Sequence, residues 1–68
     1  MEFLITEDSP VKDIPILQMA IKGHILLAAI YRRGEIIYPN GSDVLMVGDR
    51  VVVVTTVKGL TDIKDILQ

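Results

Sequence analysis

Apolar residues along this 68-residue chain fall into short runs separated by turn residues, a pattern that is typical of a small β-rich domain. The runs cover residues 2–6, 25–31, 35–38 and 50–56, and the last contains four consecutive valines. Polar residues, glycine or proline border each run. We therefore predict four strands.

Glycine and proline positions indicate how these strands are joined. Gly34 follows Arg33 between the second and third runs, and it supplies the positive φ that a tight hairpin needs. Pro39 cannot donate to a β-ladder, so the third strand should either end there or lie at an edge of the sheet. Before the last strand, Gly48 and Asp49 predict a turn in which the Asp49 carboxylate accepts backbone N–H bonds.

Two other segments have the spacing of short helices. Ile14, Leu17 and Ile21 recur at intervals of three and four, which predicts a helix from residue 15 to about residue 21. The tail, from residue 58 or 60 to 67, has one apolar face and predicts a second helix. The expected fold class is α+β, a small mainly antiparallel sheet with two short helices on one face, in the order β-α-β-β-β-α.

The second and fourth strands are apolar on both faces, which is the pattern of strands that are covered on both sides. Two short helices can cover only one face of such a sheet. An uncovered second face would form a larger apolar patch than the few hundred Å² that monomers usually expose. We therefore expect a homodimer, because two-fold self-association is the commonest oligomer.

Composition narrows the class of protein further. The chain has no cysteine and one histidine, so neither a disulfide nor a metal site of zinc type is expected. Nine acidic and seven basic residues are scattered along it, without the basic stripe of a nucleic-acid-binding protein. The apolar runs are far shorter than the roughly 20 residues that span a bilayer. With no leader-like segment, these features predict a cytoplasmic protein without direct membrane insertion.

Catalytic signatures are not found in the sequence. Ser9 and Ser42 lack the G-x-S-x-G surroundings of a serine nucleophile, and no glycine-rich phosphate loop precedes a helix. We therefore expect no enzyme activity and no catalytic residues. His24 is a structural residue at the start of a strand, a ligand contact, or a pH-sensitive group at an interface. Arg32 and Arg33 are either a solvated turn or a fork that grips a phosphate or carboxylate at a dimer seam.

The order of these motifs resembles the C-terminal domain of TrkA-type potassium-transport regulators, also called the RCK C-terminal domain. The matching segments are EDSPV at 7–11, PI at 15–16, ILLAAI at 25–30, RGE at 33–35, Ile37 with Pro39, and VGDRV at 47–51. Residues 55–67 also resemble the end of long TrkA proteins. At Asp13 the chain departs from the family, which often has glycine there, so this turn could differ.

The resemblance implies that residues 1–68 are a single regulatory domain of a longer protein. Such a domain follows an N-terminal domain that binds NAD or ATP, and the whole protein forms a cytoplasmic ring on a membrane potassium channel or transporter. The resemblance also implies a dimer whose cleft accepts a small nucleotide such as cyclic di-AMP. By location, we select His24, Ile25, Ala29 and Arg32 as candidate ligand-binding residues.

Two alternative functions remain open from the sequence. One is a DNA-binding transcriptional regulator of the swapped-hairpin type, which should show a basic surface, whereas this chain has a net charge of -2. The other is a purely structural assembly domain with an empty cleft. Duplex DNA and a panel of nucleotides, titrated separately, distinguish these alternatives from a ligand-binding regulator.

Overall fold

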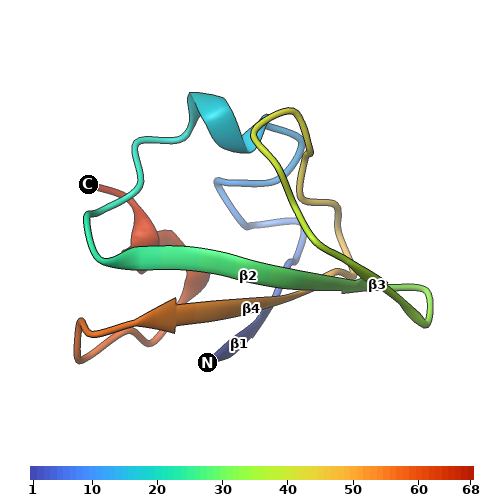
Figure 1. Cartoon of the computed structure of the whole chain (residues 1–68). Coiled ribbons are helices and arrows are strands. Elements are labelled where there is room, and N and C mark those ends of the chain that lie inside the picture. Colours follow the sequence, from blue (N-terminus) through green and yellow to red (C-terminus); the bar gives the residue numbers. More distant parts are fainter.

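Four strands form one antiparallel sheet in a computed structural model that describes all 68 residues (Figure 1). The strands are β1 (Glu2–Leu4), β2 (Ile25–Arg32), β3 (Glu35–Ile37) and β4 (Arg50–Thr55), and their order across the sheet is β1-β4-β2-β3. The predicted strands are confirmed, with ends that differ by one or two residues. No helix of the structure is long and apolar enough to cross a bilayer.

The central pair, β2 and β4, contains one irregularity that decides which side chains face the core. Leu27 lies opposite Val53 and Ile30 lies opposite Val51, with a shift in register between Leu27 and Ala29. This β-bulge lets Leu27 and Ile30 point to the same face although they are three residues apart. The predicted hairpin between β2 and β3 is also confirmed, because Arg33 and Gly34 have φ values of 51° and 79°, as a type I′ turn requires.

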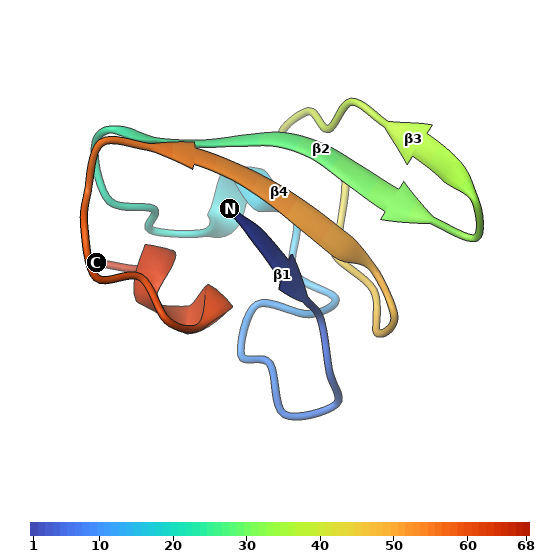
Figure 2. The same cartoon turned by 90° about the horizontal axis from the view of Figure 1, so that it is seen from below.

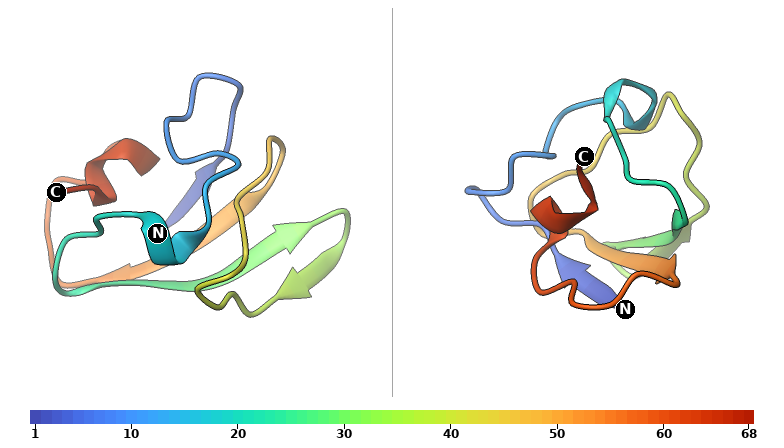
Figure 3. Two further views of the ribbon diagram at one scale, coloured as in Figure 1. Left: turned by 90° about the horizontal axis from the view of Figure 1, so that it is seen from above. Right: turned by 90° about the vertical axis from the view of Figure 1, so that its left-hand side faces the viewer.

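All other segments lie on one side of this sheet. Figure 1 shows the segment between β1 and β2, the β3–β4 connection and the 3-10 turn of the C-terminal tail above the strands, and the end-on view in Figure 3 shows the same separation. Seen from below in Figure 2, no helix or loop crosses in front of β2 and β4. We call the covered side the inner face and the other side the outer face.

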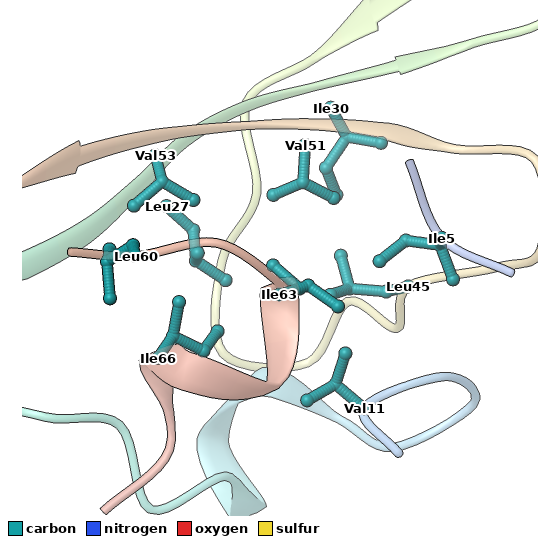
Figure 4. Close-up of a cluster of buried hydrophobic side chains, with 10 residues drawn as sticks. All are labelled: Ile5, Val11, Leu27, Ile30, Leu45, Val51, Val53, Leu60, Ile63 and Ile66. Atoms are coloured by element: carbon teal, nitrogen blue, oxygen red, sulfur yellow. The ribbon is translucent and has the colours of Figure 1, made fainter. Parts of the chain in front are cut away.

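The hydrophobic core lies between the inner face and the segments above it (Figure 4). The sheet contributes Leu27, Ile30, Val51 and Val53, which are all buried. The covering segments contribute Ile5, Val11, Leu45, Leu60, Ile63 and Ile66. Burial of each such side chain stabilises the fold by roughly 1.5–3 kcal/mol, so this one layer is the main source of stability.

The predicted helices are much shorter than expected. The first is a single 3-10 turn, η1 (Ile16–Gln18), and the second is η2 (Ile63–Ile66). Backbone groups that a helix would use internally are bonded to distant segments instead. The N–H groups of Ile16 and Leu17 donate to the carbonyls of Asp43 and Gly41 at 2.9 Å each. The prediction of two helices of about two turns is therefore wrong, although both turns lie on one side of the sheet as expected.

The two covering segments are also bonded to each other, which explains why neither continues as a helix. The Lys22 N–H donates to the Ile66 carbonyl, and the Gln68 N–H donates to the Ala20 carbonyl, both at 2.8 Å. These bonds flank an isolated bridge between Ile21 and Leu67. An extended segment that pairs in this way cannot keep the i to i−4 bonds of an α-helix.

The turn at Asp13 keeps a glycine-like backbone although the residue is aspartate. Its φ is 59°, and its N–H donates to the Leu45 carbonyl at 2.7 Å. Aspartate tolerates this left-handed conformation better than most residues. The sequence departure therefore leaves a turn whose φ lies in the region that glycine favours.

Candidate ligand site at the start of β2

Two open hollows meet at the first residues of β2. The first has a volume of about 280 Å³ and the second of about 360 Å³, and both are lined by Ile25 and Leu26. Each is close to the lower limit for a small-molecule site. The other lining residues of the first are Ile16, Ile21, Lys22, Leu27, Pro39, Asn40 and Gly41, and those of the second are His24, Val54, Thr55 and Thr56.

The polar groups around these hollows favour an anionic ligand. Lys22 lines the first hollow and His24 lines the second, while neither is lined by an acidic side chain. The Asn40 side-chain oxygen accepts hydrogen bonds from the Ser42 N–H and hydroxyl, so its amide nitrogen is the group that can donate to a ligand. The site thus combines apolar walls for a flat or hydrophobic group with basic side chains that carry no salt bridge.

His24 has a backbone conformation that costs free energy. Its φ is 65°, and the residue is exposed at the turn that leads into β2. Glycine would adopt this conformation without a steric penalty, whereas other residues lose roughly 1–2 kcal/mol. The His24 side chain makes no hydrogen bond that would offset this cost within the chain. Strained residues of this kind occur preferentially at ligand sites.

A different arrangement occupies the far end of β2, where Arg32 grips Asp49. The guanidinium donates from Nε to Oδ1 at 2.9 Å and from Nη2 to Oδ2 at 2.7 Å, and it also reaches the Val44 carbonyl at 3.0 Å. The Met46 N–H donates to Asp49 Oδ2 at 2.9 Å. This bond confirms the predicted turn in which Asp49 accepts a backbone N–H. The Asp49 carboxylate is almost completely buried.

The protonation of this pair follows from its surroundings. Burial of Asp49 acts to raise the pKa of its carboxyl group, but the hydrogen bonds from Arg32 and from the Met46 N–H, together with the Arg32 charge, leave that pKa lowered. The hydrogen bond to Asp49 likewise raises the pKa of Arg32. Both groups therefore stay charged at neutral pH, and the pair acts as a fixed connection between β2 and the start of β4.

A third hollow, of about 450 Å³, lies beside this ion pair and is lined by both of its members. Arg33, Met46, Val47 and Gly48 complete its lining. Although this hollow is larger than the other two, the half-buried Arg32 guanidinium in its wall is already paired with the buried Asp49 carboxylate. Only the exposed Arg33 remains for a ligand, so we regard the start of β2 as the better site.

The four residues selected from the sequence do not form one site within a single chain. His24 and Ile25 line the hollows at the start of β2. Ala29 lies in the middle of the sheet opposite Val52. Arg32 is seven residues beyond Ile25, roughly 23 Å along an extended strand, and its guanidinium is bound to Asp49.

Sequence reasoning missed Lys22 and Asn40 as possible ligand contacts. Lys22 is two residues from His24 and could have been included on that ground alone. Asn40 comes from the turn after β3, which the fold brings beside the start of β2. No local pattern around Asn40 indicates this neighbourhood. The structure gathers no group of three or more His, Cys, Asp or Glu side chains that could hold a metal ion.

Comparison with known proteins identifies the family. The TrkA-C domain family matches residues 1–68, which is the whole chain. A solved structure described as "Structure of RCK domain with cda" has 29% sequence identity and a TM-score of 0.72, over 85% of this chain and 80% of its own. No curated protein matches the sequence. These similarities suggest a regulatory domain of potassium-transport proteins, and the chain belongs to the TrkA-C domain family.

Proposed function

We propose that this chain is the ligand-binding and dimerisation domain of a longer cytoplasmic protein that regulates a potassium channel or transporter at the inner face of the membrane. Membership of the TrkA-C domain family supports the regulatory role. The observation that carries the ligand-binding role is the pair of apolar hollows at Ile25, with Lys22 and His24 as their basic residues and no acidic lining. The proposal involves binding and no chemical reaction.

The proposed ligand is a small nucleotide with phosphate charge and flat bases. A similar RCK domain is described "with cda", and the ligand that we propose for this chain is cyclic di-AMP. In this chain, apolar side chains such as Ile21 and Ile25 would contact a base. Lys22 and His24 would contact the phosphates, because basic side chains form charge-assisted hydrogen bonds with phosphate oxygens.

Regulation would follow from linkage between the ligand and the arrangement of two subunits. A ligand changes a distant gate only if it binds one arrangement more tightly than the other, and such couplings are typically about 1–3 kcal/mol. NAD or ATP would bind only to a separate N-terminal domain of the longer protein. No cofactor is proposed for residues 1–68.

Isothermal titration of cyclic di-AMP tests this function directly. We expect saturable binding to the wild-type chain. Lys22→Gln and His24→Asn should each raise the Kd roughly tenfold or more, because one charge-assisted hydrogen bond is worth about 1.5–3 kcal/mol. Arg33→Gln is the matched control, since this exposed cation lies at the far end of β2 and should leave the affinity unchanged.

Two outcomes would contradict the ligand-binding role. If cyclic di-AMP and the other nucleotides tested gave no heat while the protein remained dimeric, a purely structural assembly domain would be the better description. If binding were equally strong in Lys22→Gln and His24→Asn, the ligand would bind elsewhere. Titration with duplex DNA at low salt tests the transcriptional-regulator alternative, for which we expect no binding because the chain has a net charge of -2.

A further inference from the structure

The turn after β3 contains a side-chain amide beside an unhindered backbone nitrogen. Asn40 is the single asparagine of the sequence, and Gly41 follows it. An asparagine side chain is long enough for its Cγ to reach the nitrogen of the next residue, and glycine has no Cβ to obstruct that approach. Asn40 is also exposed, so water can reach its amide. The two residues can therefore react with each other.

Ser42 donates two hydrogen bonds to the Asn40 side-chain oxygen. The Ser42 backbone nitrogen lies 2.9 Å from Asn40 Oδ1, and the Ser42 hydroxyl oxygen lies 2.6 Å from the same atom. Two fixed donors stabilise the negative charge that develops on a carbonyl oxygen when a nucleophile attacks its carbon. These bonds therefore make Asn40 Cγ a better electrophile than an amide in water.

The Gly41 nitrogen is the nucleophile next to this carbonyl group. Its N–H donates no hydrogen bond in the folded chain, whereas those of Asn40 and Ser42 are bonded to Asp43 Oδ2 and Asn40 Oδ1. No bond of the turn has to break before the Gly41 nitrogen loses its proton. The Asp43 N–H closes the turn by donating to the Asn40 carbonyl at 3.1 Å. The fold thus keeps the reacting groups in one compact turn, which favours an intramolecular reaction.

The position of Asn40 connects this turn to the ligand site. Asn40 and Lys22 both line the first hollow, which has no acidic side chain in its wall. A carboxylate in place of the Asn40 amide would add a negative charge to a site that now favours anions. It would repel a phosphate group and attract the Lys22 ammonium group that the phosphate needs.

We propose that Asn40 is a self-modification site, at which the chain converts its own amide into a carboxylate and so closes the first hollow to anions. The Gly41 nitrogen loses its proton to hydroxide and forms a bond to Asn40 Cγ. The bond from Cγ to Nδ2 breaks, and the amide leaves as ammonia with a proton from solvent. Water then adds to the cyclic succinimide and opens it to aspartate or isoaspartate. The closure of the hollow rests on the proposed function, whereas the reaction does not.

The two products should affect the fold differently. Aspartate leaves the main chain unchanged, and its carboxylate can accept the same two bonds from Ser42. Isoaspartate adds a methylene to the main chain just before Gly41. Figure 1 shows this connection beside η1, where the Gly41 carbonyl accepts the Leu17 N–H at 2.9 Å. A Cβ on Gly41 would lie only 3.2 Å from the Leu17 Cβ, so a longer backbone should also displace η1.

Mass spectrometry of the purified chain during incubation at physiological temperature tests the reaction. We expect replacement of the amide by a hydroxyl group at Asn40, and isoaspartate in peptides that contain it. The rate should rise with pH, because hydroxide takes up the Gly41 proton. Gln18 is the internal control. It is also exposed, but its longer side chain closes a ring more slowly, and Met19 carries a Cβ that obstructs the attack.

The Ser42→Ala variant tests whether the folded turn promotes the reaction. Loss of the hydroxyl should slow the modification of Asn40 roughly fivefold in the folded chain, which is the effect of one ordinary hydrogen bond. In urea the turn is absent, so the variant and the wild type should react equally fast. A folded chain that keeps its Asn40 amide, while the chain in urea loses it, would overturn the proposal. Equal rates in the two folded proteins would overturn the role of Ser42.

Titration with cyclic di-AMP tests the consequence for binding. Asn40→Asp reproduces the aspartate product and should raise the Kd roughly tenfold or more. The increase should exceed that of Asn40→Gln, which alters the side chain without adding a charge. If Asn40→Asp bound as tightly as the wild type, the hollow would not be closed by the modification. If the wild type bound no cyclic di-AMP although Asn40 reacted, the proposed function would fail and the modification site would stand.

Discussion

The two ends of β2 carry basic side chains that the fold uses in opposite ways. At the last residue, Arg32 is bound to a buried carboxylate and to a backbone carbonyl at 2.7–3.0 Å. Before the first residue, Lys22 and His24 line hollows and have no acidic partner. One end is therefore neutralised within the chain, and the other keeps its hydrogen-bonding capacity for a ligand.

Whether a basic side chain has an acidic partner within the chain distinguishes structural from ligand-binding positions more clearly than residue type does. Arg32 and His24 were both selected from the sequence as ligand contacts. Arg32 connects the end of β2 to the turn before β4, so its substitution should alter stability. The His24 side chain forms no salt bridge or hydrogen bond within the chain, and its backbone is strained, so its substitution should alter binding.

Removing the Asp49 charge should have the largest effect. Asp49→Asn leaves the Arg32 guanidinium without its anion in a mostly buried site, and loss of one partner of such a pair costs about 3 kcal/mol. A domain of this size rarely has more than about 3–5 kcal/mol of stability. Urea unfolding followed by circular dichroism at 25 °C should show that Asp49→Asn retains at most about 2 kcal/mol of stability, and near-wild-type stability would contradict the role assigned to the pair.

Acid should weaken the same end of β2. The folded pKa of Asp49 is lowered, so the unfolded chain binds a proton at a higher pH than the folded chain does. The stabilisation is therefore complete above the unfolded value, about 3.9, and is lost as the pH falls toward the folded pKa. Unfolding free energies measured between pH 7 and pH 3 should fall more steeply for the wild type than for Asp49→Asn.

Asp65 is a second source of acid sensitivity, and the comparison with Asp49→Asn takes it into account. Hydrogen bonds from the backbone N–H groups of Thr61 and Asp62 lower the pKa of this exposed carboxylate. Its contribution has the same sign and is present in both proteins. Equal slopes in the wild type and in Asp49→Asn would show that Asp49 does not cause the acid response.

At the start of β2, His24→Gly should raise the free energy of unfolding while it lowers the affinity for the ligand. His24→Gly removes about 1–2 kcal/mol of left-handed strain and adds about 0.4–1 kcal/mol of unfolded-state entropy, so the net gain is about 0.5–1 kcal/mol. Affinity for cyclic di-AMP should fall at the same time. Asp13→Gly is the matched control, because Asp13 has a similar φ and lines neither hollow. It should gain stability without losing affinity.

The exposed ion pair on the outer face should give the smallest effect. Arg50 and Glu2 side chains are 63 and 47% exposed, and such pairs contribute about 0–1 kcal/mol. Arg50→Gln should therefore change the free energy of unfolding of the monomer by less than about 0.5 kcal/mol in urea titrations at low protein concentration. A loss as large as that of Asp49→Asn would mean that exposure does not distinguish the two pairs.

Much of the sheet could be predicted from the sequence because its turns have strong local causes. Gly34, Pro39 and the pair Gly48 and Asp49 each restrict the backbone at the end of a strand. The two long strands are apolar throughout, so composition alone indicates that they lie in the sheet. These are local properties, and they persist in the folded chain.

The orientation of those strands could not be predicted. Residues 25–31 have no alternation of polar and apolar side chains, and the bulge after Leu27 changes the phase of the strand. Val51 and Val53 are buried while Val54 is exposed, although all are the same residue type. Only pairing with β2 decides which valines face the core.

The short helices and the full ligand site depend on contacts between distant segments. The apolar spacing of residues 14–21 is helical, but backbone bonds to residues 41 and 43 hold this segment in another conformation. In the same way, Asn40 joins the site only after the chain has folded. A prediction based on local residue spacing cannot identify contacts with segments that are distant in the sequence.

Pairing of the first strand with the last has a consequence for how the chain folds. Glu2 lies opposite Val52 and Leu4 opposite Arg50. β1 can therefore join the sheet only after the chain up to β4 is present. Pairing across such a long loop has a large entropic cost, and proteins dominated by such contacts fold in roughly milliseconds to seconds. During synthesis, β1 stays unpaired until β4 has left the ribosome, which makes sheet closure a late event.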